Sequence, residues 1–266
     1  MPKIYLQGGF GNVLFQLVHY LALKNQGHNP VFIDTLTKEN VITKLLGWKI
    51  HDQIYLDVFK DLGVVVKKQS ILKTALIMVF GKISQRLKTP VCSIYFFSES
   101  FKDSYLTTSK HLFGYFQSKR YLESNQKEIQ QIAKSLQKLY LSNKHRAPYV
   151  AVHYRYGDSV WAKEYEDYYT AVKQNIQQNK DVIVLTDSKD RAKEFFKDLK
   201  VRSLKVMSNT PILDFSYMLG AKELYCAPST FSWWASQTKS NKERVFSPYF
   251  LKNKLGFFSK SELIIS

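Results

Sequence analysis

Residues 149–158 read YVAVHYRYGD, an apolar and β-prone run that ends in a cluster of polar side chains. The run Tyr149–His153 predicts a buried strand, because strands of a parallel sheet are apolar on both faces. His153, Arg155 and Asp158 stand at or just beyond its carboxyl end, which is where ligands bind in open α/β sheets. The segment therefore predicts a Rossmann-like unit with a ligand site here.

Downstream of this segment, strand-like apolar runs alternate with helical patterns. Strands are expected at residues 182–185, 204–207 and 223–226, and helices at 165–178, 191–199 and 212–220. Such alternation is typical of a parallel sheet covered by helices. Ser229 and Thr230 follow the last of these strands, as Arg155 follows the strand at Tyr149–His153.

The amino-terminal half opens in the same way. Lys3–Leu6 predicts a strand, Val13–Lys24 a helix and Val31–Ile33 a second strand. An α/β fold with two Rossmann-type domains follows. A long amphipathic helix is predicted over Tyr121–Leu141, and the polar stretch after it is a linker, so the predicted domains are residues 1–145 and 146–266.

The turn between the first strand and helix reads GGFGN at residues 8–12. Glycines let a backbone turn sharply and approach a ligand, and a helix N-terminus favours an anion. Gly9, Gly11 and Asn12 are therefore candidate phosphate contacts. A glycine turn that only packs the strand against the helix is the alternative.

The segment after the last predicted strand holds Ser229 and Thr230, which can cap a helix while meeting a phosphate. Trp233 and Trp234 are expected to fill the core, as aromatic residues at such joins do. His153 has a similar alternative, because a histidine at a strand end is more often a hydrogen-bonded core residue than a catalyst.

The formal net charge is +17, with 39 Lys and Arg against 22 Asp and Glu. A nucleotide, a phospholipid surface, an anionic glycan or a nucleic acid could each be the attracted anion. Two cysteines form no disulfide framework and point to a reducing compartment, and the six histidines show no metal-binding spacing. We expect no metal, no cofactor and a cytoplasmic location.

Residues 36–110 carry the weakest pattern. The apolar run Ile71–Ile83 is broken by Lys73, Gly81 and Lys82, and it is shorter than the ~20 residues of a membrane-spanning helix. It is expected to pack on the core or to rest at a membrane interface. The N-terminus runs directly into the first strand, so no signal peptide is expected.

Four segments resemble the α-1,2-fucosyltransferases of glycosyltransferase family 11. The opening GGFGNVLFQLVHYLAL resembles the family's glycine-rich start, and HYRYGD resembles its HxRRGD signature. Residues 114–121, GYFQSKRY, are similar to the family's GYxQSxxYF, and Ser229–Ala235 matches STFSWWA. The four occur in the family's order between residues 8 and 236, so together they are far more specific than any one of them.

The resemblance implies a GT-B-like arrangement of two Rossmann-type domains facing a cleft. It also implies inverting, metal-independent transfer of fucose from GDP-fucose to a glycan acceptor, with O2 of a terminal galactose as the usual hydroxyl. Synthesis of surface polysaccharide or lipopolysaccharide is the implied setting. The carboxyl-terminal half would hold the donor, and the amino-terminal half would contact the acceptor.

Residue roles carry over from the resemblance position by position. Arg155 matches the arginine at the donor pyrophosphate, and Ser229–Phe231 matches the segment against the phosphate or base. Asp187 matches an acidic position assigned to the nucleotide, while His153 and Asp158 complete the candidate catalytic set. No general base is assigned.

Two departures from the family pattern keep alternatives open. The second arginine of HxRRGD is Tyr156 here, so that guanidinium is missing or is supplied by another residue. The family's GNQMFQ reads GNVLFQ, which keeps Asn12, Phe15 and Gln16. A different GDP-sugar donor is the first alternative, and a non-catalytic nucleotide- or glycan-binding protein is the second.

The basic charge allows two further partners. A nucleic-acid-binding protein would also explain it, but no recognised binding motif is present, so no nucleic acid is expected. A transferase that builds lipid-linked glycans would gain from attraction to an anionic inner leaflet, so peripheral membrane contact is expected.

Overall fold

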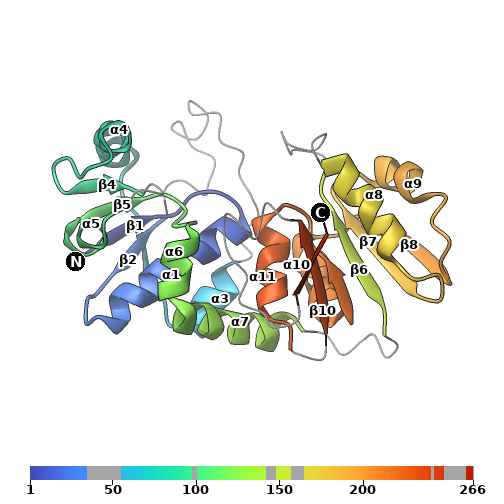
Figure 1. Ribbon diagram of the computed structural model, residues 1–266. Coiled ribbons are helices and arrows are strands. Elements are labelled where there is room, and N and C mark those ends of the chain that lie inside the picture. The colour runs from blue at the N-terminus through green and yellow to red at the C-terminus, as the bar shows by residue number, and fades with distance from the viewer. Residues whose placement is uncertain are drawn as a thin grey trace. The chain divides into compact units, whose positions relative to one another are not determined.

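The computed structural model describes residues 1–34, 55–97, 101–141, 148–156, 165–240 and 243–248, together with the backbone of a strand at 262–265. The chain divides into two compact units, Met1–Ile132 and Ala133–Ser266. Each unit is built on a parallel sheet with helices packed on it (Figure 1). The division falls inside helix α7 (Gln126–Tyr140), whereas the boundary predicted at residue 145 lies outside the described residues.

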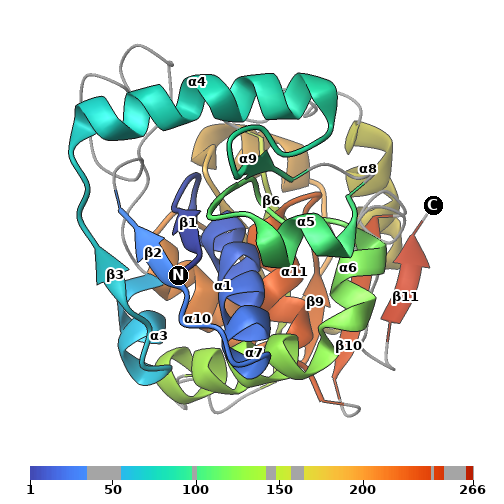
Figure 2. The ribbon, with the colours of Figure 1, turned by 90° about the vertical axis from the view of Figure 1, so that its left-hand side faces the viewer.

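Unit 1 has a five-stranded sheet in the order β3-β2-β1-β5-β4. Its strands are β1 (Lys3–Tyr5), β2 (Val31–Ile33), β3 (Val66–Lys67), β4 (Ile94–Phe96) and β5 (His111–Phe113). Its helices are α1 (Phe10–Asn25), α3 (Tyr55–Asp61), α4 (Ile71–Leu87), α5 (Asp103–Thr108) and α6 (Lys119–Ser124), with the first part of α7. All strand pairs in this sheet are parallel, and α4 runs along the outside of the unit (Figure 2).

Two predicted helix boundaries in unit 1 were wrong. Helix α1 begins at Phe10 rather than Val13, so Gly11 and Asn12 lie in its first turn and Gly9 is its N-cap. The helix predicted over Tyr121–Leu141 is two helices, α6 and α7, separated at Asn125. There the backbone leaves the helical region (φ −122°, ψ 38°), and the Asn125 side chain donates to the Tyr121 carbonyl at 2.7 Å.

Unit 2 has a six-stranded sheet in the order β11-β10-β9-β6-β7-β8. Its strands are β6 (Val150–Tyr154), β7 (Asp181–Thr186), β8 (Ser203–Met207), β9 (Glu223–Tyr225), β10 (Arg244–Pro248) and β11 (Glu262–Ile265). Its helices are α8 (Glu166–Asn175), α9 (Lys189–Phe196), α10 (Pro211–Gly220) and α11 (Thr230–Gln237). Every residue of β6 is buried, and its parallel neighbours are β7 and β9.

The aromatic residues predicted to fill the core of unit 2 do so. Trp233 and Trp234 are fully buried in α11, with their rings edge to face at a centroid distance of 5.0 Å. They anchor the inner side of α11, so the N-terminal end of this helix is held against the sheet.

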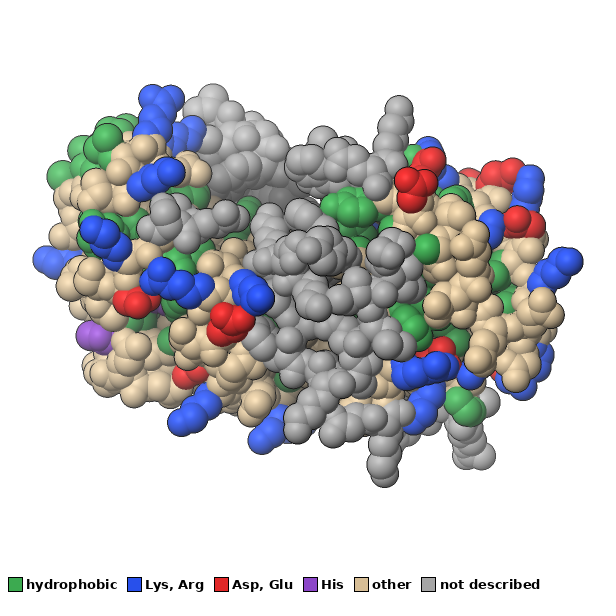
Figure 3. Space-filling model, viewed as in Figure 1, with side chains coloured by type: hydrophobic (Ala, Val, Ile, Leu, Met, Phe, Trp, Pro, Cys, Tyr) green, Lys and Arg blue, Asp and Glu red, His purple; other side chains and the backbone are tan. Residues whose placement is uncertain are grey.

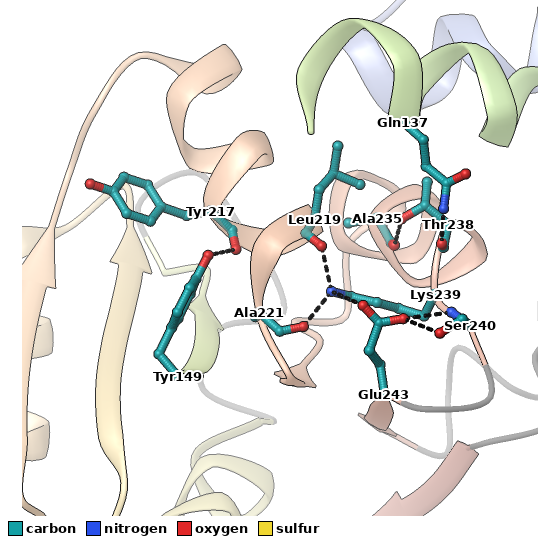
Figure 4. A network of polar contacts seen from close by, with 10 residues as sticks. All are labelled: Gln137, Tyr149, Tyr217, Leu219, Ala221, Ala235, Thr238, Lys239, Ser240 and Glu243. Carbon is teal, nitrogen blue, oxygen red and sulfur yellow. Dashed lines mark hydrogen bonds and ion pairs between the residues drawn. The ribbon is translucent and has the colours of Figure 1, made fainter. Parts of the chain in front are cut away.

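A buried lysine joins α11 to the end of α10 (Figure 4). The Lys239 side chain is 1% exposed, and its Nζ donates to the carbonyls of Leu219 at 2.8 Å and Ala221 at 2.6 Å. A cation suits this place, because the last carbonyls of a helix are otherwise unsatisfied and carry partial negative charge. Burial lowers the pKa of Lys239 to about 8, with Glu243 acting in the opposite direction.

We expect Lys239→Met to destabilise the protein by about 2 kcal/mol at pH 7, because two buried carbonyls lose their donor. The pKa of Lys239 is about 8 in the folded protein and 10.5 in the unfolded chain, so between these pH values the unfolded chain binds the extra proton. The stability of the native protein relative to the variant therefore rises as pH increases from about 8 to 10.5. Urea unfolding at pH 7 and pH 10 measures both effects. The exposed Lys222→Met is the matched control, and equal stabilities of all three proteins would contradict the assignment.

Candidate functional site

The predicted site residues of unit 2 follow three strands that lie side by side. Arg155 follows β6, Asp187 follows β7, and Ser229 precedes α11 in the segment after β9. Since the strands are parallel, their carboxyl ends share one edge of the sheet. Arg155, Asp187 and Ser229 therefore lie at the same edge of the sheet, and their predicted roles stay predictions.

Arg155 and Asp187 form a direct ion pair. Nε of Arg155 lies 3.1 Å from Oδ2 of Asp187, and both side chains are partly exposed. The other oxygen, Oδ1, accepts the backbone N–H of Tyr156 at 2.9 Å. The backbone N–H of Arg155 donates to the hydroxyl of Tyr169 at 3.1 Å, so both the backbone and the side chain of Arg155 are held in place.

The start of α11 contributes backbone donors to the same edge. Ser229 is the N-cap, and its Oγ accepts the N–H of Phe231 at 3.3 Å. Thr230 and Phe231 form the first turn, where the helix dipole favours negative charge. The Phe231 ring lies 5.8 Å from the His153 ring, which brings this segment next to the end of β6.

His153 is a buried neutral imidazole. It is 6% exposed, and its Nδ1 has no hydrogen-bond partner among the described residues. Burial lowers the pKa of His153 to about 3, helped by Arg155 and opposed by Asp187. An imidazole in this state carries no charge toward an anionic ligand and packs near Phe231. The catalytic role predicted for His153 stays a prediction.

Arg191 is a site residue that the sequence patterns did not identify. Its Cζ lies 3.4 Å from the centroid of the Tyr156 ring, and its terminal nitrogen contacts Oε1 of Glu166 at 3.1 Å. The Tyr156 hydroxyl donates to the same Glu166 oxygen at 3.1 Å. A guanidinium from the first turn of α9 therefore lies against the residue that replaces the second arginine of the HxRRGD pattern.

One sequence signal could have identified Arg191. It stands four positions after Asp187 in the helix that follows β7, which is the place where side chains reach back over the carboxyl edge of the sheet. Its contact with Tyr156 depends on β6 and β7 being neighbours in the sheet, and a local sequence pattern does not predict which strands are neighbours.

The glycine segment of unit 1 packs against the GYFQS segment. Gly8 has φ +80°, and a Cβ there would lie 2.7 Å from Nδ2 of Asn12 and 2.9 Å from the Tyr115 ring, so only glycine fits. Nε2 of Gln117 donates to Oδ1 of Asn12 at 2.8 Å. The two segments, distant in sequence, thus form one cluster at the start of α1.

Gln16 has a structural role in this cluster. Its Nε2 donates to the Gln7 carbonyl at 2.7 Å, and its Oε1 accepts the Gln7 N–H at 3.2 Å. Gln16 is fully buried, so its amide satisfies backbone groups of the turn that no strand pairs. Gly11 is also buried inside α1, whereas Gly9 sits partly exposed at the N-cap.

Asp158 lies outside the described residues, so its predicted role stays a prediction. Among the residues that are described, no group of three or more His, Cys, Asp or Glu side chains could hold a metal ion. Arg155 and Arg191 are two cations that the described part of the edge offers to an anionic ligand.

No family model matches the sequence, and no curated protein sequence matches it. The chain is similar in structure to the Escherichia coli ADP-heptose lipopolysaccharide heptosyltransferase II, with 9% identity, a TM-score of 0.51 and coverage of 100% of this chain and 90% of that one. It also matches the E. coli heptosyltransferase WaaC with ADP at a TM-score of 0.48, with 11% identity over 98% and 92% of the two chains. The fucosyltransferase NodZ from Bradyrhizobium matches at 0.41, with 14% identity over 88% and 91%.

The first of these matches shows a shared fold. The predicted α/β class with two Rossmann-type parallel sheets is confirmed. Membership of glycosyltransferase family 11 and the placement of the two domains around a cleft stay predictions.

Because His153 is buried and neutral, we expect it to make the stability of the protein depend on pH in the acid range. In the unfolded chain its pKa is 6.5, so acid protonates the unfolded state first and lowers the free energy of unfolding. Between pH 7 and pH 5 we expect the native protein to lose about 2 kcal/mol more than His153→Gln does. Denaturant unfolding at both pH values measures this difference. Partly exposed His28→Gln is the control, and parallel losses in native protein and His153→Gln would contradict the assignment.

Proposed function

We propose that the protein is a glycosyltransferase that moves fucose from GDP-fucose to a hydroxyl group of a glycan acceptor. The observation that carries the proposal is the partly exposed Arg155, oriented by Asp187 at the carboxyl edge of a Rossmann-type sheet next to the N-terminus of α11. The same residues belong to the segments that resemble the α-1,2-fucosyltransferases, which is why fucose and O2 of a terminal galactose are proposed.

The proposed chemistry places negative charge on a departing diphosphate. The acceptor oxygen attacks the anomeric carbon, the bond from that carbon to the diphosphate oxygen breaks, and the acceptor hydroxyl loses its proton. A guanidinium can bind diphosphate oxygens bidentately, and backbone N–H groups at a helix start add to the positive field. Arg155 and the first turn of α11 would stabilise the leaving GDP in this way.

Arg191 completes the proposed donor site. The family pattern has two adjacent arginines, and this chain has Arg155 followed by Tyr156. Arg191 packs on the Tyr156 ring at 3.4 Å, so it would supply the second guanidinium from a neighbouring element. The charge of the proposed donor site is then retained although the sequence motif is not.

Tyr156 also favours a second candidate within the same class. A changed contact at the diphosphate would accompany a different sugar on the guanosine diphosphate. A transferase that uses another GDP-sugar is therefore the alternative. The cysteine usage supports the proposed location, the cytoplasm. In the described part of the chain, no helix has both the length and the apolarity that crossing a bilayer requires.

The direct test is release of the nucleoside diphosphate, GDP or ADP, from purified protein given GDP-fucose, GDP-mannose or ADP-heptose, with galactose-terminated acceptors and with or without EDTA. ADP-heptose is included because the heptosyltransferase of similar fold is named for it. We expect release with GDP-fucose only, undisturbed by EDTA. Arg155→Ala should lower kcat/KM by about a hundredfold or more, because a positioned charge at the leaving group is removed. Arg202→Ala, an exposed arginine that pairs with Asp181 at the other end of β7, should leave it unchanged.

Three results would contradict the proposal. Release with GDP-mannose or ADP-heptose alone would move the assignment to the corresponding transferase. Binding of GDP without release from any donor and acceptor pair would favour a non-catalytic binding protein. Near-normal turnover of folded Arg155→Ala would remove Arg155 from the mechanism.

The role of Arg191 is tested by moving its charge. Arg191→Ala should raise the KM for the donor and lower kcat/KM about tenfold or more, since one charge-assisted contact is lost. The double variant Tyr156→Arg/Arg191→Ala places a guanidinium at the family's position and should recover most of the loss. Glu166→Gln separates a positioning effect from a direct one, because it removes the ion pair and keeps both cationic side chains. An Arg191→Ala enzyme with native kinetics would show that the stacked guanidinium only stabilises the fold.

A further inference from the structure

Helix α4 (Ile71–Leu87) has two opposite apolar faces. One face packs on the sheet of unit 1, where Ile77 and Met78 join the core cluster that contains Phe113 and Ile94. Gly81 lies on the same side, and a Cβ added there would lie 3.5 Å from the Phe113 ring. This inner face therefore accounts for the attachment of α4 to the unit.

The other face exposes large apolar side chains. Leu72 is 84% exposed, Leu76 62% and Leu87 61%, and Val79 and Ile83 are exposed as well. These residues recur every three or four positions, so on a helix of about 100° per residue they form one stripe on the side opposite to the inner face. Isolated exposed leucines are ordinary on a protein surface, whereas a continuous stripe marks an interaction site.

Cationic side chains border this outer stripe. At about 100° per residue, Lys73 lies on one flank and Lys82 and Arg86 lie on the other. All three are exposed, and the sequence has no Asp or Glu from residue 62 to residue 98. Figure 3 shows hydrophobic side chains gathered at the upper left, where Figure 1 labels α4, with Lys and Arg side chains beside them.

The charge decides which occupant fits. A second copy of this chain would bring its own Lys73, Lys82 and Arg86 against the same cations, and like charges at an interface repel. An anionic lipid surface offers apolar depth for the stripe and negative headgroups for the flanks. The inner face of α4 is buried in the protein, so the helix can lie along such a surface on its outer face alone.

We propose that the outer face of α4 docks the protein on an anionic lipid bilayer, with the apolar stripe in the headgroup and acyl-chain boundary. This inference does not rest on the proposed transferase activity. It extends the expectation of peripheral membrane contact from a net charge to a defined surface, the exposed side chains of α4.

The test is sedimentation of the purified protein with vesicles of phosphatidylcholine alone or mixed with phosphatidylglycerol. We expect binding to the mixed vesicles that weakens as salt rises, and little binding to phosphatidylcholine alone. Leu72→Gln/Leu76→Gln should weaken binding about tenfold or more, because the variant keeps the helix formers but loses the apolar stripe. Both residues are exposed, so an unchanged thermal unfolding temperature should accompany the loss.

A matched charge comparison separates this surface from the general basic character of the chain. Lys73→Gln/Lys82→Gln/Arg86→Gln removes three cations from α4, and Lys127→Gln/Lys134→Gln/Lys138→Gln removes three exposed cations from α7. The first should weaken binding about tenfold or more, while the second should change it little. Equal effects of the two triple variants would overturn the proposal in favour of non-specific charge attraction.

Three more results would overturn it. Vesicle binding that survives Leu72→Gln/Leu76→Gln would exclude the stripe. Self-association in analytical ultracentrifugation that the same variant abolishes would assign the stripe to a second copy. The variant Leu76→Trp tests insertion directly. The fluorescence emission of the new tryptophan should shift to shorter wavelength when mixed vesicles are added. An unshifted spectrum would contradict insertion.

Discussion

The carboxylate of Asp187 connects the parts of the site that come from different strands. It pairs with the Arg155 side chain and accepts the backbone N–H of Tyr156, so one residue after β7 holds the two residues after β6. This arrangement is possible because β6 and β7 are parallel neighbours in register, with Tyr154 opposite Thr186. The ion pair is partly exposed, which keeps Arg155 at the surface of the sheet edge. The contact with the Tyr156 backbone also fixes the ring on which Arg191 lies.

The two arginines at this edge come from different elements: Arg155 follows β6 and Arg191 lies in α9. Tyr156 stands at the second arginine of the HxRRGD pattern that this segment resembles, and Arg191 from α9 lies on the Tyr156 ring and contacts Glu166. A stacked guanidinium keeps its charge and its planar set of donors, so in the proposed donor site Arg191 would add a second cation to that of Arg155. His153 contributes no charge, because burial lowers its pKa to about 3.

Unit 1 combines a tight inner cluster with an unusual outer surface. The glycine turn, Asn12 and Gln117 pack so closely that a Cβ at Gly8 would overlap its neighbours, and Gln16 satisfies the backbone of the turn. These contacts give the polar residues at the start of α1 a structural role that is independent of any ligand. On the outside of the same unit, α4 presents a cation-bordered apolar stripe that the core of the unit does not use.

The sequence by itself determined the class of fold and most of the strands, because a buried parallel strand is a local apolar run, as in Val150–Tyr154 and Asp181–Thr186. It also placed Arg155, Asp187 and Ser229 after strands, and it identified Trp233 and Trp234 as core residues. It did not locate the break at Asn125, since the apolar period continues through α7 and the break depends on a side-chain contact with the backbone. Only the tertiary structure decided that Arg191 meets Tyr156 and that half of the apolar residues of α4 face outward. Both facts depend on which elements are neighbours. A local sequence pattern predicts neither the order of strands in a sheet nor the packing partners of a helix.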